Sequence, residues 1–225
     1  MKYYNTLEEY RAKSGRAGGK LVSEENGAVR GCCVGLSHGM SRVHKEVGDI
    51  HEDQEGFFVW KGHGEALIGD EVIEMKPGVS IMVPAGVPHS MKVLDDAEYY
   101  ETIWFHAAIS PDSVPEKTTS YASSIMEKTG KEMVSCDLLG AENGCVDGCR
   151  AGVTCYTDLT YTHTGIHEDQ EGFFVLEGSG IAKIGDTEFP VAAGTAFICP
   201  ANTWHSIRRD ESCAHVAVFW FHSAV

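Results

Sequence analysis

The sequence predicts an all-β protein built from two similar units, and three observations carry that prediction. A ten-residue string, IHEDQEGFFV, occupies residues 50–59 and returns at residues 166–175. Short apolar stretches alternate with Gly, Pro and Asp along most of the chain, which is typical of a sandwich or barrel of short strands. The repeat spacing of 116 residues is too long for a solenoid, so it indicates a tandem pair of domains.

The first unit begins with a predicted short helix. Residues 6–13 (TLEEYRAK) start acidic and end basic, as the helix dipole favours, and Gly15 follows them. From about residue 20 the pattern changes to short apolar runs separated by turns rich in Gly and Pro. Strands are expected at residues 56–60, 65–68, 71–75, 79–83 and 100–105.

The second unit repeats this rhythm after a polar connection. Residues 110–124 (SPDSVPEKTTSYASS) contain two prolines and are expected to form a linker. A second short helix is expected at residues 123–131, mirroring the first. The predicted domains are therefore residues 1–112 and residues 113–225.

Composition limits the classes of function. The net charge of −15 argues against nucleic-acid binding and against anionic membranes. No apolar run approaches the roughly 20 residues that a membrane span needs, and the N-terminus lacks the apolar core of a signal peptide. A cytoplasmic protein is expected, with its eight cysteines as free thiols. The spacing of Cys145 and Cys149 is too loose to predict a zinc site.

The best-kept part of each repeat carries residues that bind metals. In a strand, residues four apart share a face, so the His and Glu that open each motif point the same way. A later Pro-containing turn delivers a second His from another strand. Two imidazoles and one carboxylate bind first-row divalent metals and leave positions open for substrate. The sequence predicts up to two such metals per chain, Fe, Mn, Ni or Zn, on two sets: His51, Glu55 and His89, and His167, Glu171 and His205.

The order His-x-x-x-Glu, six residues, Gly, then Pro-x-(Gly/Asn)-x-x-His resembles the two motifs of the cupin superfamily. Two copies, over residues 25–108 and 142–225, make the chain similar to a bicupin. The resemblance implies two tandem jelly-roll barrels (double-stranded β-helices) with short flanking helices. It also implies a small-molecule substrate and a homodimer.

The chain departs from that family at one position of each motif. Cupins have a histidine two residues before the first motif histidine, where this chain has Asp49 and Gly165. Asp49 is a candidate oxygen ligand, whereas Gly165 has no side chain to offer. The other candidates for completing the sites are His163, Asp53 and Asp169.

Candidate acid/base groups are fewer. Glu101 is a candidate if its side chain faces inward, which strand parity alone leaves open, and because Ala217 stands at the matching place of the second repeat it would serve the first half alone. Asp49 and Asp53 are the other candidates, because a carboxylate beside a metal can act as a general base.

Several repeated residues are expected to lie away from the metals. His106 and His222 each end a Trp-Phe-His string, and a surface or interface role is expected for both, with a place near the pocket as the alternative. Gln54 and Gln170 have the opposite strand parity from the motif residues and are expected to face away. Trp204, next to His205, is expected to line or crowd the second pocket.

These observations favour a metal-dependent enzyme that acts on a small oxygen-rich molecule, a carboxylate or carbonyl compound. A dioxygenase is the first hypothesis, and a lyase, isomerase or decarboxylase is the alternative. A non-enzymatic small-molecule binder is a further alternative, because fold resemblance does not choose among chemistries. An enzyme needs open metal positions and a titratable group within reach, whereas a binder needs only shape and hydrogen bonds.

Overall fold

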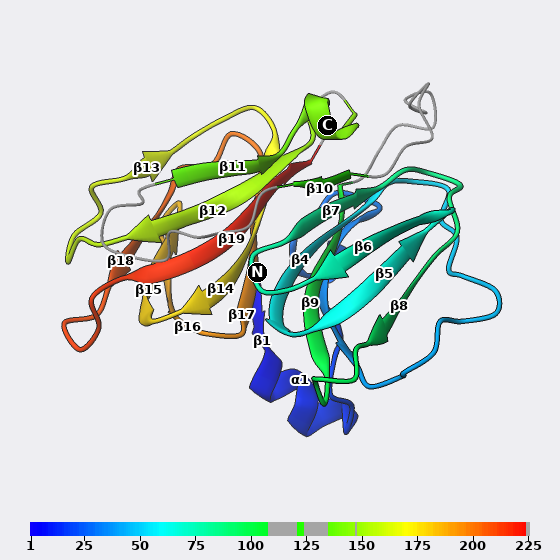
Figure 1. The fold of residues 1–225 in the computed structure, drawn as a ribbon. Helices are drawn as coiled ribbons and strands as arrows, with labels where there is room; N and C mark the ends of the chain where they lie inside the picture. The colour runs from blue at the N-terminus through cyan, green and yellow to red at the C-terminus, as the bar shows by residue number, and fades with distance from the viewer. Residues whose placement is uncertain (108–120, 124–134, 147, 224–225) are drawn as a thin grey trace.

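The computed structural model describes residues 1–107, 121–123, 135–146 and 148–223, and it consists of two similar halves that lie side by side (Figure 1). Each half is a β-sandwich of one six-stranded sheet and one smaller sheet. The all-β prediction and the tandem arrangement are therefore confirmed. No helix in these residues is long and apolar enough to cross a membrane.

In the first half the larger sheet has the order β10-β7-β4-β9-β3-β2 and the smaller sheet the order β6-β5-β8. Neighbouring strands pair antiparallel. The strands are β2 (Gly19–Val22), β3 (Cys32–Gly39), β4 (Glu55–Gly62), β5 (Gly64–Ile68), β6 (Glu71–Met75), β7 (Ser80–Val83), β8 (His89–Val93), β9 (Tyr100–Ala107) and β10 (Tyr121–Ser123).

In the second half the larger sheet has the order β1-β17-β14-β19-β12-β11 and the smaller sheet the order β13-β18-β15-β16. The strands are β1 (Tyr4–Thr6), β11 (Ser135–Leu139), β12 (Arg150–Tyr156), β13 (Thr164–Gly165), β14 (Gln170–Glu177), β15 (Ser179–Ile184), β16 (Thr187–Ala192), β17 (Thr195–Cys199), β18 (His205–Arg209) and β19 (Val216–Ser223). Short 3-10 turns at Glu24–Asn26 and Ala141–Asn143 occupy matching places in the two halves.

Each half lends one strand to the sheet of the other. β1 comes from the start of the chain but pairs with β17 of the second half, with Tyr4 opposite Phe197. β10 belongs to the predicted second domain but pairs with β7 of the first half, with Tyr121 opposite Met82. The predicted domains 1–112 and 113–225 are therefore interlocked. Most of the predicted linker, and the helix expected at residues 123–131 apart from its first residue, lie outside the described residues.

The helix α1 (Leu7–Ser14) confirms the first predicted element. Thr6 caps it, because its hydroxyl accepts a hydrogen bond from the Glu9 N–H at 3.0 Å while the Glu9 carboxylate reaches back to the Thr6 N–H. Gly15 ends it at φ 69°, a left-handed conformation that glycine adopts without strain.

The larger sheets pack against each other through an apolar core between the halves. Phe105 of β9 stacks on Phe221 of β19 with ring centroids 4.5 Å apart. Side chains alternate along a strand, so the neighbours of these rings, including His106 and His222, point the other way into each half's own interior. The core that joins the halves thus also fixes the direction of the residues that line the pockets.

Two buried glutamines tie each half to a loop of the other. Gln54 donates to a backbone carbonyl and accepts from a backbone N–H in residues 144–146, at 2.5 and 3.0 Å. Gln170 makes the equivalent pair of bonds to residues 27–29, at 3.1 and 3.0 Å. Both glutamines face away from the pockets, as their strand parity predicts, and both satisfy backbone groups that would otherwise be orphaned.

Candidate metal centres

A cluster of three histidines and one glutamate lies inside the first half. Glu55 begins β4, His89 begins β8, His106 lies near the end of β9, and His51 belongs to the segment just before β4. The turn before β8 accounts for the approach of His89. Its Gly86 has φ 75°, and its N–H donates to the His51 carbonyl at 2.8 Å. That bond brings the two parts of the repeated motif together.

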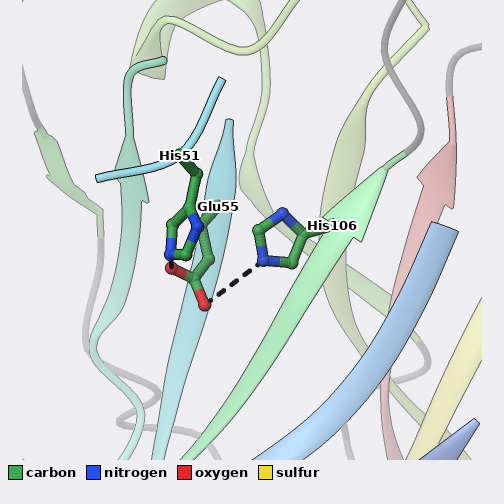
Figure 2. Close-up of side chains that lie close together, drawn as sticks. All are labelled: His51, Glu55 and His106. Carbon is green, nitrogen blue, oxygen red and sulfur yellow. Dashed lines mark ion pairs between the residues drawn. The ribbon is translucent and has the colours of Figure 1, made fainter. Parts of the chain in front are cut away.

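The three imidazoles converge on the Glu55 carboxylate, and Figure 2 shows two of them, His51 and His106, beside it. Its Oε2 is 3.1 Å from His51 Nε2 and 2.9 Å from His89 Nε2. Its Oε1 is 3.5 Å from His106 Nε2. The ligand atoms of His51, Glu55 and His106 all lie within 4.8 Å of one another. Glu55 is only 7% exposed, so these imidazoles are the polar surroundings that it has in place of water.

The second half repeats this arrangement almost atom for atom. Glu171 Oε2 is 3.1 Å from His167 Nε2 and 2.9 Å from His205 Nε2, and Oε1 is 3.4 Å from His222 Nε2. The turn is kept as well, with Asn202 at φ 55° donating its N–H to the His167 carbonyl at 2.7 Å. Asparagine tolerates the left-handed conformation better than most residues, which explains its place where the first half has glycine.

Electrostatics favour an ionised carboxylate in each cluster. Burial raises the pKa of Glu55, but hydrogen bonds from His106 and His89 outweigh it and hold the pKa at about 2. The pKa of Glu171 is lowered for the same reasons. Burial lowers the pKa of His106, but Asp53 and Glu55 more than compensate and raise it to about 9. Each cluster therefore holds a buried negative charge surrounded by nitrogen donors, which suits a divalent cation.

Two aspartates contact the Nδ1 atoms of cluster histidines, on the side of each ring away from the cluster. Asp53 Oδ2 lies 2.9 Å from His106 Nδ1, and Asp169 Oδ2 lies 2.9 Å from His222 Nδ1. Asp169 also contacts His167 Nδ1, at 2.7 Å. Such contacts fix the ring orientation and leave Nε2 directed at the cluster. Asp53 thus supports a histidine, and Asp169 supports two.

The surface or interface role expected for His106 and His222 is wrong. Their side chains are 13% and 6% exposed, and both rings point into the clusters. The repeated string Trp-Phe-His carried a usable signal, because the histidine has the same parity as the tryptophan two residues earlier, which lines the pocket in each half.

Asp49 and Gly165, which stand where the family motif has a further histidine, do not belong to the clusters. Asp49 exchanges backbone hydrogen bonds with His89, while its half-exposed side chain pairs with Lys45 and lies on the pocket wall. Gly165 lies opposite His205, and a Cβ added there would come within 2.4 Å of His205 Nε2. His163 lines the second pocket and lies 3.6 Å from Asp158. The third histidine of each cluster comes instead from the last strand of its half, as His106 and His222.

Glu101 lies at the opposite end of β9 from His106 and does not reach the cluster. Its carboxylate is 5% exposed and contacts Arg11 of α1 at 2.8 Å, His38 at 3.2 Å and Lys61 at 3.6 Å. His38 itself lines the first pocket. Glu101 is therefore linked to the pocket by its contact with His38.

Each cluster opens into a cavity, of about 610 Å³ in the first half and about 550 Å³ in the second. The first is lined by residues that include Leu36, His38, Met91, Tyr100 and Trp104. The second is lined by residues that include Asp137, Arg150, Thr154, Tyr156 and Trp220.

Trp204 does not line the second pocket, contrary to expectation. Its ring packs edge-on against Tyr161, with centroids 6.0 Å apart.

Comparison with known proteins gives a family and a fold. Residues 44–105 and 160–221 each match the family described as the cupin domain. The matches end one residue before His106 and His222, the third histidines of the clusters. No curated protein sequence matches the chain.

The solved structures that are similar to the chain have low sequence identity to it. AerE from Microcystis aeruginosa is 12% identical with a TM-score of 0.72, over all of both chains. Salicylate 1,2-dioxygenase from Pseudaminobacter salicylatoxidans is 14% identical with a TM-score of 0.70, over 96% of this chain and 81% of its own. Oxalate decarboxylase from Bacillus subtilis is 10% identical with a TM-score of 0.71, over 98% of this chain and 77% of its own.

Proposed function

The chain belongs to the cupin family, and on that premise we propose that it is a metal-dependent bicupin enzyme, a dioxygenase acting on a small carboxylate or carbonyl compound. The observation that carries the proposal is the cluster itself. In each half three imidazole Nε2 atoms lie within 3.5 Å of one buried carboxylate at the base of a cavity.

The donor sets fit a first-row divalent metal. In the first half the metal would be held by His51, Glu55, His89 and His106, and in the second by His167, Glu171, His205 and His222. Nitrogen and carboxylate donors of this kind bind Fe, Mn, Ni or Zn. A metal held there supplies Lewis-acid polarisation of a substrate oxygen and, as iron, the capacity to activate O₂.

The residues around the first cluster prepare a substrate for that chemistry. Leu36, Phe57 and Trp104 give the cavity apolar walls, which limit water near the reacting atoms. His38 is the candidate for moving a proton, since Glu101 holds its Nδ1 at 3.2 Å and the ring lines the cavity. Glu101 would then act by orienting His38. Asp49 stays a second candidate base from the pocket wall.

The fold similarity to salicylate 1,2-dioxygenase and to oxalate decarboxylase is compatible with oxidative cleavage and with decarboxylation. Fold alone does not select between them. Decarboxylation, with lyase or isomerase chemistry, is therefore the second candidate, and it predicts turnover without consumption of O₂.

The test combines metal analysis with oxygen uptake. The full chain is purified without chelator, and its Fe, Mn, Ni and Zn are measured per chain by elemental analysis. Oxygen consumption is then followed with a panel of aromatic and aliphatic hydroxy- and keto-carboxylates. About two equivalents of iron and uptake stoichiometric with substrate support the dioxygenase. Metal with substrate loss but no oxygen uptake supports the second candidate. A chain that stays metal-free after metal is added back, yet binds small molecules, is a binder.

A further inference from the structure

The two pockets differ sharply at the residue that flanks the last-strand histidine of the cluster, His106 or His222. In the second half Arg150 of β12 lies directly opposite His222 of β19. In the first half the same position, opposite His106, is Cys33. Directly opposed residues of an antiparallel pair project from the same face of the sheet. Each therefore stands beside its histidine, a guanidinium in one half and a thiol in the other.

Arg150 is available to a ligand. It is exposed and lines the same cavity as Glu171 and His222. Among the described residues nothing forms an ion pair or hydrogen bond with its guanidinium, although Asp137 lines the cavity as well. Cys33 is 7% exposed, and burial raises the pKa of its thiol, so it stays neutral. Among the described residues, only the second half has a permanent cation directly opposite this histidine, because Lys45, which lines the first pocket, is paired with Asp49.

The same strand adds hydroxyl groups to that wall. Thr154 accepts a hydrogen bond from Trp220 Nε1 at 3.0 Å and donates to Ser135 at 3.1 Å, so its position is fixed. Tyr156 also lines the cavity, and within the described part of the chain its hydroxyl has no hydrogen-bond partner. Arg150, Thr154 and Tyr156 alternate with outward residues along β12 and so share its inner face.

The matching wall of the first half keeps a hydroxyl, because Ser37 stands where β12 has Thr154, but it lacks the guanidinium and the tyrosine of β12. Gly39 stands where β12 has Tyr156, and Tyr100 of the paired strand fills the space. A Cβ at position 39 would lie 2.1 Å from Tyr100 Cζ. The tyrosine has thus changed strands between the halves, and both walls carry hydroxyls, but β3 has no arginine or lysine to match Arg150 of β12.

We propose that the second half binds a small carboxylate, with the Arg150 guanidinium donating hydrogen bonds to its oxygens beside the metal site, and that the first half does not share this preference. A guanidinium matches a carboxylate in a paired geometry. The inference rests on the proposed function, because without a cation at the cluster Glu171 and Asp169 would repel an anion. It deepens that function by assigning the carboxylate specificity to one half.

The test is calorimetric titration of the full Mn²⁺-loaded chain with matched pairs of ligands, benzoate against benzamide and succinate against succinamide. The variants are Arg150→Gln, the conservative Arg150→Lys, and Cys33→Ser as the matched control in the first half. Loss of a charge-assisted hydrogen bond predicts that Arg150→Gln weakens carboxylate binding by about 10- to 100-fold and leaves the amides unchanged. Arg150→Lys should recover part of the affinity, and Cys33→Ser should have no effect.

Metal content, measured on the same samples, separates this inference from the proposed function. Carboxylate binding by Arg150→Gln equal to that of the parent chain, at full metal content, would overturn the inference and leave the metal enzyme standing. Failure of the parent chain to bind either carboxylate would also overturn it. A metal-free parent chain that still prefers carboxylates in an Arg150-dependent way would overturn the proposed function, and it would show that the anion site needs no metal at the cluster.

Discussion

The two halves hold the same donor set inside different walls. The three distances between histidine and glutamate atoms are 3.1, 2.9 and 3.5 Å in the first half and 3.1, 2.9 and 3.4 Å in the second. The turn that delivers the motif histidine is kept, even though asparagine replaces glycine in the second half. A metal tolerates little change in its donors, so this geometry is what a shared metal requirement would preserve.

The walls have diverged where a ligand would make contact. His38 with its partner Glu101 becomes Cys155 with Ala217, which removes the proton-transfer candidate from the second half. Cys33 becomes Arg150, which adds a cation there. The difference suggests that the halves divide the work, with acid/base chemistry in the first pocket and anion recognition in the second.

The largest expected effect tests whether the donor sets are equal. His106→Ala and His222→Ala should each remove about one metal equivalent per chain, as should His51→Ala and His167→Ala, because each takes a nitrogen donor from one cluster. Elemental analysis of the purified variants measures it. Asp49→Asn is the control and should keep full metal content, since its side chain pairs with Lys45. Full metal content in His106→Ala would remove the last-strand histidine from the donor set.

The next effect should differ between the halves. Asp169 holds two histidines and Asp53 holds one. Loss of such a supporting carboxylate lowers metal affinity by about 10- to 100-fold. Asp169→Asn should therefore weaken the second site more than Asp53→Asn weakens the first, as measured by competition with a chromophoric chelator. Equal losses would mean that the contact between Asp169 and His167 contributes nothing.

The fold and six of the eight cluster residues could be predicted from the sequence, because both depend on local pattern. The exact repeat fixed the register of His51 with Glu55 and of His167 with Glu171, and strand parity directed each pair inward. The surface or interface role expected for His106 and His222 is wrong, because a position near the end of a strand does not by itself place a side chain at the surface. Their parity with Trp104 and Trp220 was the overlooked signal.

The remaining features depend on contacts between distant segments. β1 joins the larger sheet of the second half and β10 joins the larger sheet of the first half. Local sequence periodicity does not predict either pairing. Strand parity correctly turned Gln54 away from the metal, but nothing in the sequence names the backbone groups that it meets across the interface. Glu101 looked like a pocket residue because Arg11, its partner 90 positions away, could not be identified from the sequence.

A smaller effect tests the symmetry of the interface. Gln54→Ala and Gln170→Ala should each lower the free energy of unfolding by about 1–3 kcal/mol, because each leaves a buried or half-buried backbone N–H and carbonyl without their partner. Urea denaturation followed by tryptophan fluorescence measures the change. Similar losses are expected, since the two glutamines make equivalent bonds. A loss confined to one variant would show that only one of the two contacts holds the halves together.

The smallest effect belongs to the first half alone. Hydrogen bonds to Asp96 and Glu74, at 2.9 and 3.0 Å, raise the pKa of His63, and the second half has Ser179 at this place. A histidine whose pKa is raised by folding stabilises the protein below its unfolded pKa of about 6.5, and that contribution is lost as the pH rises through the folded pKa. His63→Gln should therefore lower stability by at most about 1 kcal/mol near pH 5.5 and leave it unchanged near pH 9. Urea midpoints at both pH values measure it, with Ser179→Gln as the matched control that should show no pH-dependent change. An equal loss at both pH values would mean that packing, and not charge, is what His63 contributes to the first half.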